Sequence, residues 1–251
     1  MSLYAVIGGS GLYQPLTDDN KFISQYVDTP LGTTSSPLVH CEWAGCPVVF
    51  LTRHGSDHQI PPHKINYRAN LWALKHAGVT HVIAVNAVGG ISSEFFKEAL
   101  CVPDQIIDYT YGREHTFSTG NSPVEHVDFT FPYSDSVRLQ LIEAAKTDHI
   151  TLQNTGVYGC TQGPRLETAA EIKRLAGDGC DMVGMTGMPE AALARELNLE
   201  YASIALVVNR AAGLSQGLID MADIKQVLNN GMAKIKALIS TTLAQQAIKS
   251  L

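Results

Sequence analysis

The chain has 251 residues, of which 45% are hydrophobic and 17% charged, and its formal net charge is −6. This is the composition of an ordinary globular protein with enough apolar residues for a sizeable core. The basic residues are scattered rather than arranged in a stripe, which argues against nucleic-acid binding. No apolar stretch of roughly 18 residues is present, which argues against a membrane helix.

The N-terminus and the cysteines indicate where the protein works. The start, MSLYAVIGG, lacks the basic region and the cleavage site of a signal peptide, so we expect none. The five cysteines form no CxxC or His/Cys cluster. We therefore expect free thiols, most of them buried, no metal site and a cytoplasmic location.

Apolar runs and glycine turns predict alternating strands and helices. In chain order we expect a strand at 3–7, a hairpin of 37–43 and 47–51, a helix at 66–76, a strand at 82–85, helices at 136–146 and 169–176, a strand at 182–185, a helix at 190–197, a strand at 203–208 and a helix at 221–246. This alternation predicts one α/β domain over residues 1–251 with a largely parallel sheet, in which ligands bind beyond the carboxyl ends of the strands. We expect the glycine turns at these ends. Residues 101–154 give no clear pattern and could form a cap, a subunit contact or loops.

The turn Gly8–Gly11 follows the first predicted strand. It can present backbone N–H groups, and Ser10 its hydroxyl, to an anion; the alternative is a tight turn without a ligand. The spacing is not GxGxxG, because Gln14 stands three positions after Gly11, and no Walker lysine follows. We therefore expect neither a dinucleotide site nor a P-loop.

Arg53 and His54 follow the predicted strand that ends at Leu51. A guanidinium beside an imidazole suits a phosphate dianion, whereas the alternative is a surface arginine beside a histidine that is bonded within the fold. His58 and His63 lie nearby, but no carboxylate or thiol completes a convincing zinc ligand set.

Three further residues offer groups to a phosphate or a sugar. Asn86, in the run NAVGG, could bind either one or could simply cap a turn. Met185 could contact a sugar or a base, while its ordinary alternative is the core. Thr186 offers a hydroxyl to phosphate.

Two residues suit a purine base. The carboxylate of Glu167, after Leu166, could accept N1–H of a 6-oxopurine, or the residue could be an acidic group at a helix start. Asn209 closes a β-branched strand, where an amide needs a partner. Its carbonyl could accept a purine N–H while its NH₂ donates to O6. This favours hypoxanthine or guanine over adenine.

Together, the segments IGGSGL, TRHG, NAVGG, GPRLET and GMTGMPE resemble the trimeric purine nucleoside phosphorylase and methylthioadenosine phosphorylase family, from about Tyr4 to the C-terminal helix. The resemblance implies a single α/β domain with a mixed central β-sheet flanked by helices. It implies a homotrimer that binds a small-molecule nucleoside and phosphate. It implies no cofactor, and inorganic phosphate would be a co-substrate. The residues that would bind phosphate are Ser10, Arg53, His54, Asn86, Ala87 and Thr186. Met185 would contact the ribose; Glu167, Leu166 and Asn209 would contact the base; Asn209 and His54 would be catalytic.

The two branches of this family match different parts of the chain. IGGSGLY, TRHG and NYRANLWAL resemble the methylthioadenosine branch, whereas NAVGG, LET and Asn209 resemble the 6-oxopurine branch. The histidine that binds a 5′-hydroxyl in the inosine branch has no match in residues 217–223, where Met221 falls. His126 resembles the residue that a neighbouring subunit lends to the 5′ side. An apolar 5′ pocket with a 6-oxopurine end fits 5′-methylthioinosine.

The expected reaction is phosphorolysis through an oxocarbenium-like sugar. Asn209 would stabilise the departing purine, and phosphate would capture the sugar. The alternatives are an inosine or guanosine phosphorylase, a methylthioadenosine phosphorylase, a hydrolase of similar fold and a non-catalytic nucleoside-binding module. Phosphate dependence of base release separates a phosphorylase from the last two.

Overall fold

The computed structural model describes residues 2–9, 12, 22–120 and 123–249, so Ser10, a predicted phosphate ligand, lies outside the described residues. The strands are β1 (Tyr4–Gly8), β2 (Ile23–Gln25), β3 (Asp28–Thr29), β4 (Gly32–Thr33), β5 (Leu38–Trp43), β6 (Cys46–Thr52), β7 (His81–Gly90), β8 (Leu100–Cys101), β9 (Gln105–Asp108), β10 (Val157–Cys160), β11 (Met182–Gly184) and β12 (Glu200–Arg210). The helices are α2 (Tyr67–His76), α3 (Asp135–Thr147), α4 (Ala169–Gly177), α5 (Glu190–Glu196) and α6 (Met221–Lys249), with a 3₁₀ turn at Pro62–Lys64.

The main sheet has the strand order β2-β5-β6-β1-β7-β11-β10-β9, with β12 paired to β7 and β8. The pairs β1–β6, β1–β7, β7–β12, β9–β10 and β10–β11 are parallel. The pairs β2–β5, β5–β6, β7–β11 and β8–β12 are antiparallel. The sheet is therefore mixed, as the family resemblance implied. The expectation of a largely parallel sheet holds for the central strands β6, β1, β7 and β12, whereas the hairpin β5–β6 and the reversed strand β11 add antiparallel pairs.

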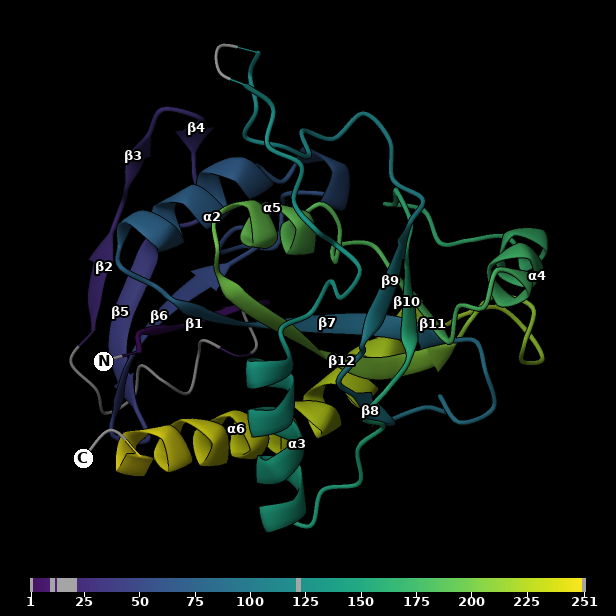
Figure 1. Ribbon diagram of the computed structural model, residues 1–251. Helices are drawn as coiled ribbons and strands as arrows, with labels where there is room; N and C mark the ends of the chain where they lie inside the picture. The colour runs from purple at the N-terminus through teal and green to yellow at the C-terminus, as the bar shows by residue number, and fades with distance from the viewer. Residues whose placement is uncertain (1, 10–11, 13–21, 121–122, 250–251) are drawn as a thin grey trace.

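Helices cover both faces of the sheet. The side chains of β1 point alternately to the two faces and pack against different helices. Ala5 and Ile7 pack into a core cluster with residues of α2 and α5. Tyr4 and Val6 pack on the opposite face with residues of α3 and α6. Figure 1 shows these layers, with α2 and α5 above the sheet and α3 and α6 below it. Successive side chains of a strand point to opposite faces, so β1 is buried on both sides.

The structure confirms the hairpin and each of the five helices that the sequence predicts. Ala44 and Gly45 take positive φ angles of 51° and 78° in the turn between β5 and β6. The side chain of Asn66 caps α2 by accepting from the Ala69 N–H at 3.1 Å. Each predicted helix starts within one residue of its observed start, because these caps and apolar stripes are local signals.

The expectation that every glycine turn ends a strand was wrong for β7. This strand continues through Gly89 and Gly90, where we expected a turn. A Cβ at Gly90 would lie 1.8 Å from the carbonyl oxygen of Phe95, and one at Gly89 would lie 3.3 Å from Val183. Gly90 therefore allows the close approach of the Phe95 backbone, and Gly89 allows close packing of the Val183 side chain.

All five cysteines are buried and free, as expected. Among the described residues, no helix is long and apolar enough to span a membrane.

Candidate active site

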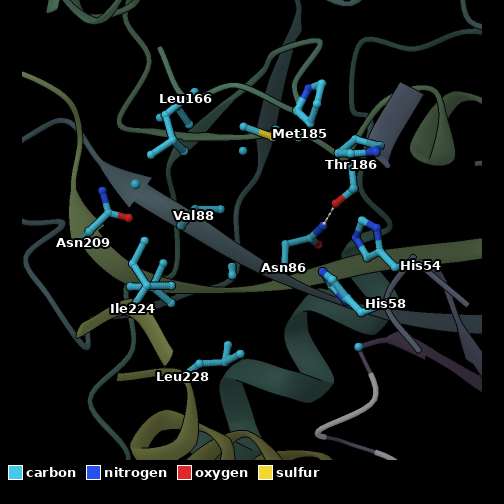
Figure 2. A pocket seen from close by; sticks show the side chains of 18 of the residues that line it. His54, His58, Asn86, Val88, Leu166, Met185, Thr186, Asn209, Ile224 and Leu228 are labelled. Carbon is cyan, nitrogen blue, oxygen red and sulfur yellow. Dashed lines mark hydrogen bonds between the residues drawn. The ribbon is translucent and has the colours of Figure 1, made fainter. Parts of the chain in front are cut away.

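A pocket of about 550 Å³ lies where five strands end or pass. Its lining includes Arg53 and His54 after β6, the β7 residues from Val85 to Gly89, Met185 and Thr186 after β11, and Asn209 near the end of β12. In Figure 2, Asn209 and Leu166 lie at one end, and His54, His58, Asn86 and Thr186 at the other. The topology therefore brings together predicted residues that are far apart in the chain, such as Arg53 and Asn209, which are separated by 156 positions.

Arg53 is buried, which excludes the surface arginine considered from the sequence. Its side chain is 2% exposed, and that of Glu190, at the start of α5, is fully buried. Nε and Nη2 of Arg53 donate to the two Glu190 carboxylate oxygens, each at 2.7 Å, and Nη1 donates to the Val85 carbonyl at 3.2 Å. Burial opposes the charged guanidinium, but the Glu190 carboxylate holds the pKa of Arg53 above its ordinary value. Arg53 is therefore a fixed cation at the pocket wall.

His54 faces the pocket as a neutral imidazole. Its Nδ1 lies 2.8 Å from the Ile60 carbonyl oxygen, which can only accept, so Nδ1 carries the proton and Nε2 a lone pair. Burial lowers the pKa of His54 to about 4. The hydrogen bond to Ile60 acts in the opposite direction, while the nearby positive charge of Arg53 lowers the pKa further. The ring also packs on His58, with centroids 4.5 Å apart. Nε2 is therefore an acceptor at neutral pH.

A directed chain of hydrogen bonds crosses the floor of the pocket. The Ser203 hydroxyl donates to Asn86 Oδ1 at 2.6 Å, and Asn86 Nδ2 donates to Thr186 Oγ1 at 2.7 Å. All three residues are less than 8% exposed. Because Thr186 Oγ1 accepts from Asn86, its own proton is left for another acceptor. Asn86 lies inside β7, so it does not cap a turn, and Ser203 was not foreseen from the sequence.

The other end of the pocket carries Glu167, Leu166 and Asn209. Thr168 and Glu171 form the capping box of α4, so the helix-start role considered for Glu167 belongs to Glu171. Glu167 accepts a hydrogen bond from Thr161 Oγ1 at 2.6 Å and lines the pocket. The amide nitrogen of Asn209 donates to the Arg210 carbonyl at 2.7 Å, and Figure 2 shows the amide oxygen turned toward the pocket.

An apolar wall from the start of α6 closes the side between these two ends. It comprises Ile219, Met221, Ile224, Leu228 and Met232. Ile224 and Leu228 lie side by side below the cavity in Figure 2. Met221, the first residue of α6, is 65% exposed. The sequence indicated only Met221 of this wall, because the spacing of the other residues is that of any helix face packed on a core.

Two predicted residues, Ala87 and His126, have weaker or other placements. Ala87 lines the pocket and is exposed. His126 is exposed between β9 and α3 and is not part of the pocket lining in its own chain. His58 and His63 were considered for zinc. Within the described ranges, no group of three or more His, Cys, Asp or Glu side chains could hold a metal ion.

Comparison with known proteins identifies the family to which this chain belongs. A family model described as Phosphorylase superfamily matches residues 3–244. The chain belongs to this superfamily. The expected enzyme class, a phosphorylase that acts as a pentosyltransferase, is confirmed.

Individual relatives in the superfamily cover nearly the whole chain. A Pseudomonas syringae pv. tomato protein named "Probable S-methyl-5′-thioinosine phosphorylase" is 53% identical over 245 residues, which are 97% of this chain and 99% of the relative. The 6-oxopurine nucleoside phosphorylase of Pyrococcus furiosus is 43% identical over 247 residues, 95% of this chain and 91% of its own. The solved structure of methylthioadenosine phosphorylase from Schistosoma mansoni in complex with adenine superimposes with a TM-score of 0.92 at 31% identity, covering 99% of this chain and 93% of that one.

Proposed function

We propose that the chain catalyses phosphorolysis of S-methyl-5′-thioinosine to hypoxanthine and 5-methylthioribose 1-phosphate, a purine salvage reaction. The observation that carries this proposal is the division of one pocket into three parts. Asn209 and Leu166, which precedes Glu167 in the chain, lie at one end, and Thr186 and His54, which follows Arg53, lie at the other. The apolar residues Ile224 and Leu228 of α6 lie between them. These parts suit a base, a phosphate and an apolar 5′ substituent.

Phosphate would bind at the end formed by β6, β7 and the turn after β11. Of the five N–H groups of a guanidinium, the bonds described above give three of those on Arg53 to Glu190 and Val85, which leaves two for an anion. The Thr186 hydroxyl donates to a second phosphate oxygen. His54 Nε2 accepts the P–OH proton of monohydrogen phosphate. Ala87, through its backbone, and Ser10 complete the proposed set, and Asn86 acts through Thr186.

The purine would lie between Asn209 and Glu167. The Asn209 carbonyl oxygen faces the cavity and can accept a proton held at N7 of the purine. The Glu167 carboxylate can accept N1–H, which hypoxanthine has and adenine lacks. Leu166 lies beside the base. Met185 would pack against the ribose that joins the two ends.

The reaction follows from how charge moves between these groups. As the bond from C1′ to N9 breaks, its electron pair passes to the purine, and N7 takes up a proton from water. The Asn209 carbonyl oxygen accepts a hydrogen bond from this N7–H, and the P–OH proton that phosphate gives up through His54 returns to water, so the protons balance. An oxygen of phosphate forms the new bond to C1′ on the opposite face and balances the developing positive charge of the sugar. Interactions that strengthen in this transition state accelerate the reaction. Phosphate is itself the nucleophile, so the proposed reaction requires no metal or organic cofactor.

The 5′ substituent would contact the α6 wall. Ile224, Leu228 and Met221 are apolar, so a methylthio group gains about 0.8 kcal/mol for each buried CH₂-sized unit. A 5′-hydroxyl without a partner loses hydration there. The two effects together favour methylthioinosine over inosine by roughly 2 kcal/mol, or about thirtyfold in specificity.

We also propose a cytoplasmic homotrimer built from one nucleoside phosphorylase domain over residues 1–251. The family match over 3–244 supports the single domain, and the five buried free thiols fit a reducing compartment. His126 would reach the 5′ side of a neighbouring site. Val124 and Phe131, exposed on the same segment, supply apolar surface for that contact. Sedimentation equilibrium tests the trimer.

The deciding experiment is a panel of methylthioinosine, methylthioadenosine, inosine and guanosine, each assayed with and without phosphate. The proposal predicts phosphate-dependent base release with methylthioinosine as the best substrate. A tenfold preference for methylthioadenosine would refute the roles of Asn209 and Glu167. Base release that is independent of phosphate would instead indicate a hydrolase.

A further inference from the structure

Arg113 lies in the segment between β9 and α3, which has no clear sequence pattern and whose described residues form neither helix nor strand. It is buried, with 8% of its surface exposed. It is not part of the pocket lining, so it would not touch a substrate. Its burial therefore needs another explanation.

The guanidinium of Arg113 donates hydrogen bonds to three parts of the chain. Nη1 bonds to the carbonyls of Met185 at 2.9 Å and Met188 at 2.6 Å and to the Tyr67 hydroxyl at 3.2 Å. Nη2 bonds to the carbonyls of Thr161 at 3.2 Å and Gln162 at 2.8 Å, and Nε bonds to Gln162 Oε1 at 3.2 Å. All of these acceptors are uncharged. Burying a guanidinium without a carboxylate partner costs free energy unless its N–H groups are hydrogen-bonded, as they are here.

Of these acceptor residues Met185 lines the pocket, and each of the others lies close in the chain to a lining residue or is hydrogen-bonded to one. Thr161 and Gln162 lead from β10 toward Glu167, and the Thr161 hydroxyl bonds directly to that carboxylate at 2.6 Å. Met185 and Met188 flank Thr186. Tyr67 donates in turn to the carbonyl of Pro62, another residue of the pocket lining, at 3.0 Å.

We propose that Arg113 is a positioning residue that fixes the base-binding wall, which carries Glu167, relative to the phosphate-binding wall, which carries Thr186. This inference rests on the proposed function, because it gives those two side chains their roles. A planar guanidinium has five N–H donors in a fixed arrangement and can bind carbonyls of both walls at once. The lysine ammonium has only three donors without this planar arrangement, so it replaces only part of these bonds. A displacement of about 1 Å between reacting groups can cost on the order of 100-fold in rate.

The test compares Arg113→Ala with Arg138→Ala. Arg138 is the matched control because it is 9% exposed and also donates to backbone carbonyls, those of Pro103 at 3.0 Å and Asn154 at 2.6 Å, away from the pocket. We expect both variants to lose stability. Only Arg113→Ala should lower kcat/KM per folded molecule, on the order of 100-fold, and raise KM for both phosphate and the nucleoside.

Two further readouts separate positioning from a merely structural role. Guanidinium chloride at a sub-denaturing concentration should restore part of the activity of Arg113→Ala and none to Arg138→Ala. Arg113→Lys should keep the fold with intermediate values of both KM. Equal activity per folded molecule in Arg113→Ala and Arg138→Ala would overturn the proposal.

If Arg113→Ala does not fold, Arg113→Lys and Arg138→Lys make the same comparison, and equal kinetic constants would again overturn it. The wild-type enzyme in the same assay reports on the proposed function. Its preferred nucleoside and its phosphate dependence do not depend on Arg113. A wild-type enzyme with a different preferred base would refute the proposed function, while a selective kinetic loss in the Arg113 variants would still support the positioning of the two walls.

Discussion

Replacing Glu190 by glutamine would leave Arg53 with its charge but without its counter-charge. Both side chains are at most 2% exposed, and the pair is bidentate at 2.7 Å. Breaking a buried ion pair from one side costs roughly 3–5 kcal/mol. In a chain of this length, 1 kcal/mol shifts Tm by about 2–4 °C, so we expect Glu190→Gln to lower Tm by roughly 6–20 °C.

The same change should make the variant respond more strongly to phosphate. In the wild type the Arg53–Glu190 pair is neutral overall, whereas in Glu190→Gln the bare guanidinium attracts a dianion. A ligand that binds only the folded state raises Tm according to its affinity. Phosphate should therefore raise Tm more in Glu190→Gln than in the wild type.

Differential scanning fluorimetry across a phosphate series measures both effects, with chloride at equal ionic strength as the ionic control. Glu143→Gln is the matched variant, since it breaks an exposed pair with Lys146 at 3.2 Å and should change Tm little. An unchanged Tm in Glu190→Gln, or a phosphate response no larger than in the wild type, would refute the role of the ion pair.

Four other predictions follow from the site. Asn209→Asp should raise the barrier for 6-oxopurine nucleosides by roughly 2–4 kcal/mol, because a carboxylate repels O6, and relatively favour 6-aminopurines in kinetic assays. Ser203→Ala removes the donor to the amide that orients Thr186, so KM for phosphate should rise about fivefold while KM for the nucleoside stays unchanged. Burial lowers the pKa of His54 from the ordinary 6.5 to about 4, so between these values the unfolded chain binds a proton that the folded chain does not, and stability falls as the pH drops from 6.5 toward 4. His54→Asn should reduce that loss by roughly 2–3 kcal/mol in denaturant titrations at pH 7 and pH 4.5; an equal loss in both proteins would contradict the shifted pKa. Met221→His supplies a donor near the 5′ end, and the preference for methylthioinosine over inosine should shrink; an unchanged ratio would remove Met221 from the 5′ pocket.

Features of the fold that depend on local signals could be predicted from the sequence. The hairpin turn at Ala44–Gly45 and the start of α2 at Asn66 are set by residues that are neighbours in the chain. Strands β9 and β10 were missed because each has only four residues and no alternating pattern. The length of β7 was underestimated because glycine usually interrupts a strand, and its close-packing role depends on Phe95 and Val183.

The candidate site divides in the same way. The sequence indicated the groups that face the pocket, because glycine turns and polar residues follow strands. It could not reveal their fixed partners. Glu190 lies 137 positions from Arg53 and Ser203 lies 117 from Asn86, so only the tertiary fold pairs them. Arg113 was missed for the same reason, since Tyr67, the hydrogen-bond partner of its side chain that is nearest in sequence, is 46 positions away.

The proposed reaction transfers a pentosyl group from a 6-oxopurine to phosphate in this pocket. Phosphorus NMR of the enzyme with methylthioinosine and inorganic phosphate tests it most directly. We expect the inorganic phosphate signal to be replaced by that of a sugar 1-phosphate ester, in step with the release of hypoxanthine. Release of hypoxanthine with the phosphate signal unchanged would contradict it.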